Sequence, residues 1–155
     1  MSSIRVSAKA VIIKEGKILL LKHEDKQGYW YSLPGGGQNP GEKLSDALVR
    51  ECREEIGATV KVENVVFIRD YIANNHEFKD EEPDTHQLEI MFECSLSEHY
   101  LPQNGINPDS TQKDVLWFEL AELRNIRLFP KELVIHLQNR SNSLKQSEIY
   151  LGDIN

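Results

Sequence analysis

GGQNPGEKLSDALVRECREEIGA, residues 36–58, sets a glycine-rich turn directly before a helix. Ser45 or Asp46 can cap the first amides of this helix through a side-chain oxygen. Gly57 can end it in the left-handed conformation that glycine adopts without a Cβ clash. The stretch therefore predicts a helix over Leu44–Ile56. Apolar residues recur in it at spacings of three and four, which gives one buried face: Leu44, Ala47, Leu48, Cys52 and Ile56.

The same helix carries three carboxylates on one surface. Glu51, Glu54 and Glu55 stand at positions i, i+3 and i+4, so their side chains are neighbours. Clustered carboxylates oppose one another's ionisation, and divalent cations that prefer oxygen ligands relieve this repulsion. A solvated helix face is the ordinary explanation of such a charge run. The fixed spacing of the glycines and charges around it favours a metal site instead.

The spacing over residues 36–58 resembles the signature of the Nudix hydrolases, G-x5-E-x7-R-E-U-x-E-E-x-G-U, where U is a bulky apolar residue. Cys52 and Ala58 depart from this signature, because both are small residues at U positions. A looser similarity extends over residues 4–138. The charged positions and both glycines agree with the signature at Gly36, Glu42, Arg50, Glu51, Glu54, Glu55 and Gly57.

The resemblance implies an α+β fold of the Nudix type, an α/β/α sandwich with a mixed β-sheet. We expect one domain over residues 1–155, because the length suits a single core, while the tail after about residue 140 carries no pattern. The segment 24–29 is expected to be a polar loop, and short helices are predicted at 120–124 and 130–139. Two strands at 4–14 and 17–23 are expected to pair as a hairpin. Further strands are predicted at 30–33, 59–72, 86–96 and 114–118.

The resemblance also implies a site for Mg²⁺, or for Mn²⁺, at this helix. The expected ligands are the carboxylates of Glu51, Glu54 and Glu55. Gly35, in the turn before the helix, lets the backbone pass close enough to offer its carbonyl oxygen as a further ligand.

The expected catalytic residues are Glu51, Glu54 and Arg50, and Glu42 is expected to orient the metal ligands together with Arg50. The general base varies within the resembled family, so several carboxylates remain candidates. Glu89 and Glu93 are two of them, because they lie on the same side of one predicted strand. The others belong to an acidic loop over residues 73–85: Asp80, Glu81, Glu82 and Asp84.

Substrate binding is expected at the glycine turn and at nearby basic and aromatic residues. The backbone of Gly36 and Gly37 can approach a diphosphate, and Arg5 can contact its charge. Trp30 and Tyr31 can stack on a nucleobase, although aromatic residues in strands more often belong to the core. Further candidates for these contacts are Arg69, Lys22, Tyr71 and Phe78.

Composition restricts the partners. The chain has 18 Lys and Arg residues against 25 Asp and Glu residues and a formal net charge of −7, so we expect no contact with a long nucleic acid. No apolar run approaches the roughly 20 residues that span a bilayer, and no apolar leader follows Met1. We therefore expect a cytoplasmic protein without a membrane partner.

Cys52 and Cys94 lack metal-ligand spacing and are expected to be reduced thiols. The resemblance is compatible with a homodimer.

Two functional classes remain in play. The first is a hydrolase in which metal-activated water cleaves a phosphoanhydride bond of a nucleoside diphosphate linked to another moiety, such as a nucleotide sugar, ADP-ribose, a dinucleotide or a nucleoside triphosphate. The second is a catalytically silent domain that senses nucleotides. The three clustered carboxylates favour the hydrolase, because a binding domain does not need them. RNA decapping is disfavoured by the acidic balance.

Overall fold

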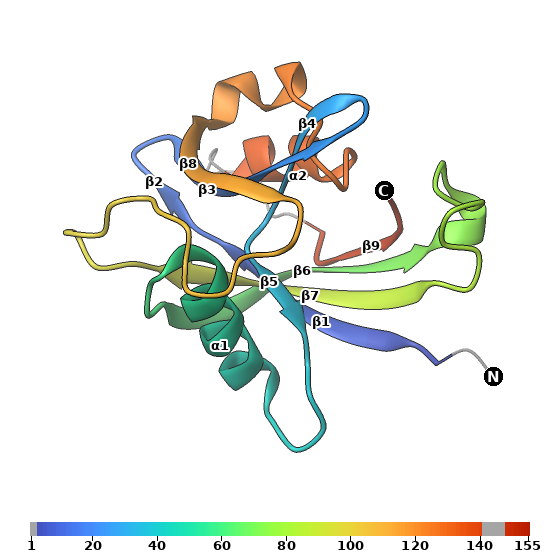
Figure 1. Ribbon diagram of the computed structural model, residues 1–155, viewed down its shortest axis with the longest axis horizontal. Coiled ribbons are helices and arrows are strands. Elements are labelled where there is room, and N and C mark those ends of the chain that lie inside the picture. Colours follow the sequence, from blue (N-terminus) through green and yellow to red (C-terminus); the bar gives the residue numbers. More distant parts are fainter. Residues whose placement is uncertain (1–2, 141–147) are drawn as a thin grey trace.

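The computed structural model describes residues 3–140 and 148–155 and arranges them around a five-stranded mixed sheet (Figure 1). Its strands are β1 (Arg5–Val11), β5 (Gly35–Gly37), β6 (Lys61–Ile72), β7 (His86–Ser95) and β9 (Tyr150–Asp153). They lie in the order β5-β1-β7-β6-β9. β1 runs parallel to β7 and β6 runs parallel to β9, while the other two pairs are antiparallel.

A second, four-stranded sheet is antiparallel throughout. Its strands are β2 (Ile13–Lys14), β3 (Lys17–Asp25), β4 (Gly28–Ser32) and β8 (Gln112–Glu119). The segment 24–29, expected to be a loop, instead forms the end of β3 and the start of β4. The two strands meet at a tight turn, and this prediction was wrong.

The expected hairpin forms only in part. β2 pairs with β3 across the turn at Glu15 and Gly16, both of which have positive φ angles. β1 does not join it, because all seven of its residues pair in parallel with β7. Residues from both sides of β1 are buried, so this strand lies in a sheet that is covered on both faces. The hairpin prediction is therefore wrong for β1.

Helix α1 (Leu44–Ile56) has the predicted bounds. Its apolar face packs against Ala8 and Ala10 of β1, and Leu48, for example, is fully buried there. Gly57 ends the helix in the left-handed conformation with φ 66°, as predicted. The predicted cap was wrong, because the residue before the helix is the extended Lys43 and no side chain caps the first amides.

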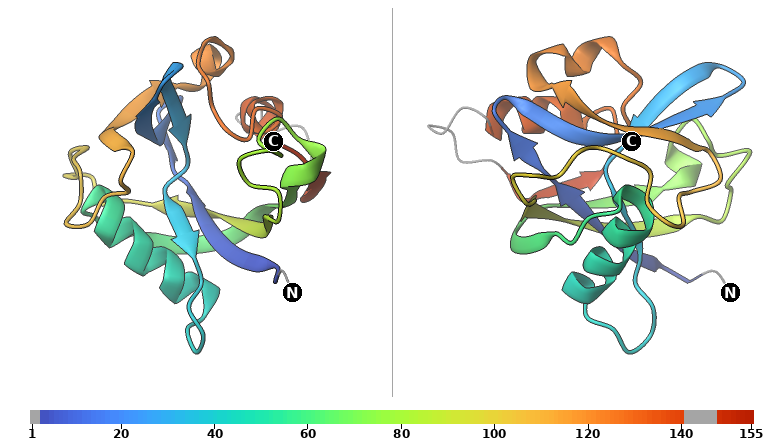
Figure 2. Two further views of the ribbon diagram at one scale, coloured as in Figure 1. Left: turned by 45° about the vertical axis from the view of Figure 1, so that its right-hand side comes forward. Right: turned by 60° about the vertical axis from the view of Figure 1, so that its left-hand side comes forward.

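The remaining helices lie on the other side of the mixed sheet from α1 (Figure 2). They are the 3₁₀ turn η2 (Leu120–Asn125) and helix α2 (Leu133–Arg140), close to the predicted positions, and a further short 3₁₀ turn, η1 (Ala73–Asn75), follows β6. Leu133 and Leu137 of α2 pack with Phe67 and Met91 of the mixed sheet in a core separate from the one under α1. This arrangement confirms the expected α+β sandwich.

The segment after residue 140 contributes more than the sequence indicated. Its strand β9 extends the mixed sheet beside β6, with Ile68 paired to Tyr150 and Asp70 paired to Asp153. The register of β6 with β7 shifts between Val62 and Phe67. Within residues 3–140 and 148–155, no helix is both long and apolar enough to cross a bilayer.

Candidate active site

A cavity of about 790 Å³ is lined by residues from both sheets and from the loops between them. Arg5 and Lys9 of β1 and Arg69 of β6 bring three cationic side chains to it. Carboxylates also line it, from Glu82, Glu89 and Asp109. Aromatic side chains line it as well: Trp30, Tyr71, Phe78 and Phe129. The cavity therefore combines charged and aromatic side chains, and Arg69 lies over the ring of Tyr71 at 5.2 Å.

The segment expected to be a glycine turn forms the short strand β5, for which the name glycine turn is kept, and it lies directly against the carboxylates of α1. Two of its residues face charged side chains. A Cβ on Gly36 would lie 2.6 Å from Cδ of Glu51, and a Cβ on Gly37 would lie 2.5 Å from Nη2 of Arg5. Both distances are far below van der Waals contact, so any larger side chain would displace a charged group. Glycine at these two positions therefore leaves space for the carboxylate of Glu51 and the guanidinium of Arg5.

Glu55 is the most constrained carboxylate of the helix, with 1% of its surface exposed. Its Oε1 accepts a hydrogen bond of 2.7 Å from the amide of Gly35, whereas its Oε2 has no hydrogen-bond partner among the described residues. Burial raises the pKa of Glu55 to about 9, and the nearby Asp109 carboxylate adds to this, while Lys9 and the Gly35 amide oppose it. A buried acceptor without a partner costs about 1–3 kcal/mol, so this oxygen is suited to an incoming cation.

Arg50 ties the other carboxylates together. Its guanidinium contacts Glu42 at 2.7 Å, Glu51 at 3.0 Å and Glu54 at 3.7 Å. It also donates a hydrogen bond of 2.9 Å to the carbonyl of Gly37. Hydrogen bonds from Arg50 lower the pKa of Glu42. One cation thus links the carboxylates of α1 to the glycine turn.

The donor set fits a hard divalent cation, although the side chains are not gathered into a ready-made cluster. Among residues 3–140 and 148–155, no group of three His, Cys, Asp or Glu side chains is close enough to hold a metal as it stands. The donors nevertheless are carboxylate oxygens beside a backbone carbonyl, the ligands such ions prefer. The carbonyl of Gly35 accepts a hydrogen bond of 3.2 Å from Nζ of Lys9, so a cationic group already lies against it.

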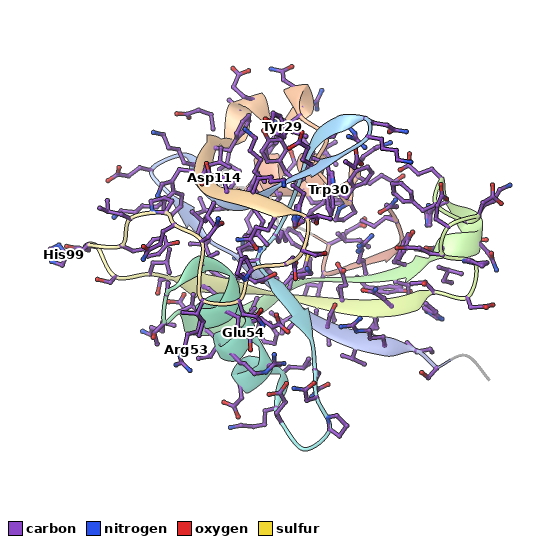
Figure 3. The ribbon with its side chains drawn as sticks, in the orientation of Figure 1. Tyr29, Trp30, Arg53, Glu54, His99 and Asp114 are labelled. Atoms are coloured by element: carbon purple, nitrogen blue, oxygen red, sulfur yellow. The ribbon has the colours of Figure 1, made fainter. Side chains whose placement is uncertain are left out.

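The predicted substrate-binding residues separate into two groups. Arg5 and Trp30 line the cavity, and Gly36 and Gly37 lie in the turn beside it. Tyr31 instead belongs to the core, where its ring packs on Phe118, so its predicted contact with substrate was wrong. The reason is the two-residue period of a strand, which turns neighbouring side chains to opposite faces. In Figure 3, Trp30 lies above the mixed sheet on β4, whereas Glu54 lies below it on α1.

The two candidate bases on β7 have different surroundings. Glu89 lines the cavity and forms a buried ion pair of 2.9 Å with Arg69. Burial alone would raise the pKa of Glu89, but Arg69 and Lys9 outweigh it and lower that pKa. Glu93 does not line the cavity, and its carboxylate pairs with Arg140 of α2 at 3.0 Å. Of the two candidates, only Glu89 therefore lies at the cavity.

Several residues at the site were not identified from the sequence. Lys9 was missed because it is a single charge inside an apolar strand, although it shares a face with Arg5 at a spacing of four. Asp109 comes from an irregular loop and carries no local pattern. His23 stacks on Trp30 with ring centroids 4.0 Å apart and is held by the hydroxyls of Thr111 and Ser32. Burial lowers the pKa of His23 to about 4, so the ring is neutral near neutral pH.

Of the other aromatic, basic and acidic candidates, Arg69, Tyr71, Phe78 and Glu82 line the cavity. Lys22 does not, because its ammonium lies 3.9 Å from the centre of the Tyr29 ring. The two cysteines are buried and unpaired, as expected of reduced thiols.

A sequence model of the NUDIX domain matches residues 3–137. The chain belongs to the NUDIX domain family. A NUDIX hydrolase structure from Nitrosomonas europaea has a TM-score of 0.70 at 21% identity, and the alignment covers 93% of this chain and 97% of that one. That similarity confirms the expected fold.

Two curated relatives each match a little over half of the chain. Nucleoside triphosphatase NudI of Salmonella agona is 30% identical over 89 residues, which cover 54% of this chain and 63% of that protein. ADP-ribose pyrophosphatase of Methanocaldococcus jannaschii is 33% identical over 89 residues, which cover 56% of this chain and 48% of that protein. The alignments thus span less than two thirds of either relative.

Proposed function

We propose that the protein is a Mg²⁺-dependent hydrolase that cleaves a phosphoanhydride bond of a nucleoside diphosphate linked to another moiety. The observation that supports this most directly is the position of Glu55. Its buried carboxylate has one oxygen bound to the amide of Gly35 and the other without a partner among the described residues. Three cationic side chains line the adjoining cavity.

The diphosphate would lie along the basic side chains of the cavity, Arg5, Lys9 and Arg69. Arg5 and Lys9 project from the same face of β1, so they can contact successive phosphate groups of one chain. Arg69 is held in place by its ion pair with Glu89 and by a hydrogen bond to the carbonyl of Ile154. A guanidinium fixed in this way binds a phosphate without a further loss of side-chain freedom.

The metal ligands in this proposal are Glu51, Glu54, Glu55 and the carbonyl of Gly35. Mg²⁺ at that position, or Mn²⁺ in its place, supplies charge neutralisation of the phosphates and a bound water of lowered pKa. Arg50 keeps Glu51 and Glu54 oriented through its contacts at 3.0 and 3.7 Å.

Proton transfer needs a carboxylate with one oxygen left over after it has bound the metal, and without a tight ion pair to Arg50. Glu54 makes the looser contact with Arg50, so we assign it the role of accepting a proton from the attacking water. Glu89 is bound to Arg69 and acts instead by holding that guanidinium toward the substrate.

The substrate moiety is proposed from the relatives and the cavity wall. An ADP-ribose pyrophosphatase and a nucleoside triphosphatase are both among the similar proteins. The rings of Trp30, Phe78 and Phe129 offer a surface on which a nucleobase can stack. These features support a nucleotide, and we propose ADP-ribose and nucleotide sugars as the first compounds to test, followed by dinucleotides and nucleoside triphosphates.

A hydrolysis screen with identification of both products tests this function. The purified chain is incubated with each compound and Mg²⁺, and the Glu55→Gln variant serves as the control for contaminating activity. Release of a nucleoside monophosphate by the wild type alone is the expected result. If no compound is cleaved while one binds tightly, the catalytically silent sensing domain is the correct assignment.

A further inference from the structure

Strand β9 lies outside the part of the chain that the NUDIX sequence model matches, yet it is bound to a loop at the cavity. The carboxylate of Asp153 accepts three hydrogen bonds from one short segment. Oδ1 accepts from the amide of Ile72 at 2.9 Å and lies 2.6 Å from Nε2 of His76. Oδ2 accepts from the side-chain amide of Asn75 at 2.8 Å. Asp153 thus binds Asn75 and His76, near the start of the loop over residues 73–85.

The same loop is held at other points, which define the position that Asp153 stabilises. The amide of Ala73 donates to the carbonyl of Thr85 at 3.0 Å and closes the base of the loop. The hydroxyl of Tyr71 donates to Glu82 at 3.2 Å, and the ring of Phe78 packs on Phe129 with centroids 5.4 Å apart. Each of these contacts brings the loop toward the cavity.

Two loop side chains, Phe78 and Glu82, line the cavity itself. We propose that Asp153 is a positioning residue for substrate binding, because it holds the 73–85 loop in the place where Phe78 and Glu82 form the cavity wall. This inference rests on the proposed function, since it assigns the wall to the nucleotide substrate. Asp153 does not itself line the cavity, so it acts through the loop.

A positioning role has a specific kinetic consequence. When the anchor is lost, the loop occupies its binding position in only a fraction of the molecules, and apparent affinity falls in proportion to that fraction. The carboxylates of α1 are not attached to this loop, so the rate of the bound complex is unaffected. Removal of Asp153 should therefore raise KM and leave kcat unchanged.

Three variants test the proposal. Asp153→Ala removes all three hydrogen bonds, and Asp153→Asn keeps one acceptor oxygen for Ile72 and His76. Tyr150→Phe is the matched control on the same strand, because it deletes the hydrogen bond of 2.6 Å from Tyr150 to Asp70 without touching the start of the loop.

The first measurement is amide hydrogen exchange, which does not depend on activity. Asp153→Ala should lose protection over residues 73–85, Asp153→Asn should lose less, and Tyr150→Phe should match the wild type there. The second is the affinity for α,β-methylene-ADP, whose bridging carbon replaces the scissile oxygen. We expect about a tenfold loss for Asp153→Ala, which corresponds to a loop in position about a tenth of the time.

The third measurement is KM and kcat on the compound identified by the hydrolysis screen. A tenfold rise in KM at constant kcat for Asp153→Ala is the expected result. Unchanged protection of the loop, unchanged affinity for α,β-methylene-ADP, or a fall in kcat alone would each overturn the positioning role. Absence of hydrolysis by the wild type with intact α,β-methylene-ADP binding would refute only the proposed function.

Discussion

The carboxylate of Glu55 and the amide of Gly35 are joined by a buried hydrogen bond of 2.7 Å that connects helix α1 to the glycine turn. This bond satisfies one oxygen of Glu55, while the other has no hydrogen-bond partner among the described residues. It also means that the turn and the helix cannot move independently. The geometry of the proposed metal ligands therefore depends on two segments that are twenty residues apart in sequence.

Glu55→Gln should abolish activity and leave the metal-free fold intact. Because burial raises the pKa of Glu55 to about 9, this carboxyl is neutral at pH 7 without metal, and an amide of the same shape resembles it. Glutamine cannot supply the negative charge that a divalent cation needs, so we expect kcat/KM to fall by at least about 100-fold. Melting with and without Mg²⁺ provides the check: the wild type gains stability from the ion and the variant does not. Full activity in Glu55→Gln would contradict the assignment of Glu55 as a metal ligand.

Lys9→Met should weaken nucleotide binding, because Lys9 is one of three cationic residues that line the cavity. Loss of a charged hydrogen bond to phosphate is worth about 1.5–3 kcal/mol, so affinity for α,β-methylene-ADP should fall about 10- to 150-fold. Lys22→Met is the matched control on the neighbouring sheet, since Lys22 lies over the ring of Tyr29 outside the cavity. Titration calorimetry measures the affinity of both variants for α,β-methylene-ADP. An equal loss of affinity in Lys9→Met and Lys22→Met would contradict the proposed phosphate contact.

Trp30→Ala and Tyr31→Phe should have different effects on KM, although the two aromatic residues are adjacent in the sequence. Trp30 lines the cavity, and stacking of a base on an aromatic ring is worth about 1–3 kcal/mol, so KM should rise about 5- to 150-fold. Tyr31 lies in the core, and loss of its hydroxyl should leave KM unchanged. Steady-state kinetics on protein confirmed as folded by circular dichroism makes the comparison. A larger KM effect in Tyr31→Phe would reverse the assignment.

Stability should fall in acid because of His23. Burial lowers the pKa of His23 from its ordinary value of 6.5 to about 4, so the unfolded chain binds a proton that the folded chain does not. The contribution is complete above pH 6.5 and is lost as the pH falls from 6.5 toward 4, by at most about 1.4 kcal/mol per pH unit. Urea denaturation across this range measures the slope. His23→Gln should have a shallower slope than the wild type, and parallel slopes would rule out this histidine as the cause.

Local sequence patterns predicted the acid-bearing helix with the bounds it has, because hydrophobic periodicity and the terminal glycine act within a few residues. They failed at the cap, where Ser45 and Asp46 do not make the expected bond and the chain enters through an extended Lys43. They also failed to distinguish Glu89 from Glu93. Both acids lie on one strand, and only the packing of α2 brings Arg140 to Glu93.

The sequence did not predict which residues from distant segments of the chain meet at the cavity. Asp109, His23 and Lys9 carry no motif, and they meet because a loop and two sheets converge on the same cavity. Strand β9 is the clearest case. Its residues show no pattern of their own, but parallel pairing with β6 places Asp153 beside Ile72 and His76.

The sequence by itself determined the family, the helix and the kind of ligand that its carboxylates suit. These properties follow from side chains a few residues apart, where spacing along one helix decides which groups are neighbours. The tertiary structure alone decided which oxygen of Glu55 lacks a partner, which aromatic residue reaches the cavity and what holds the loop over residues 73–85. Those properties depend on burial and on contacts between segments remote in the chain, which local spacing does not encode.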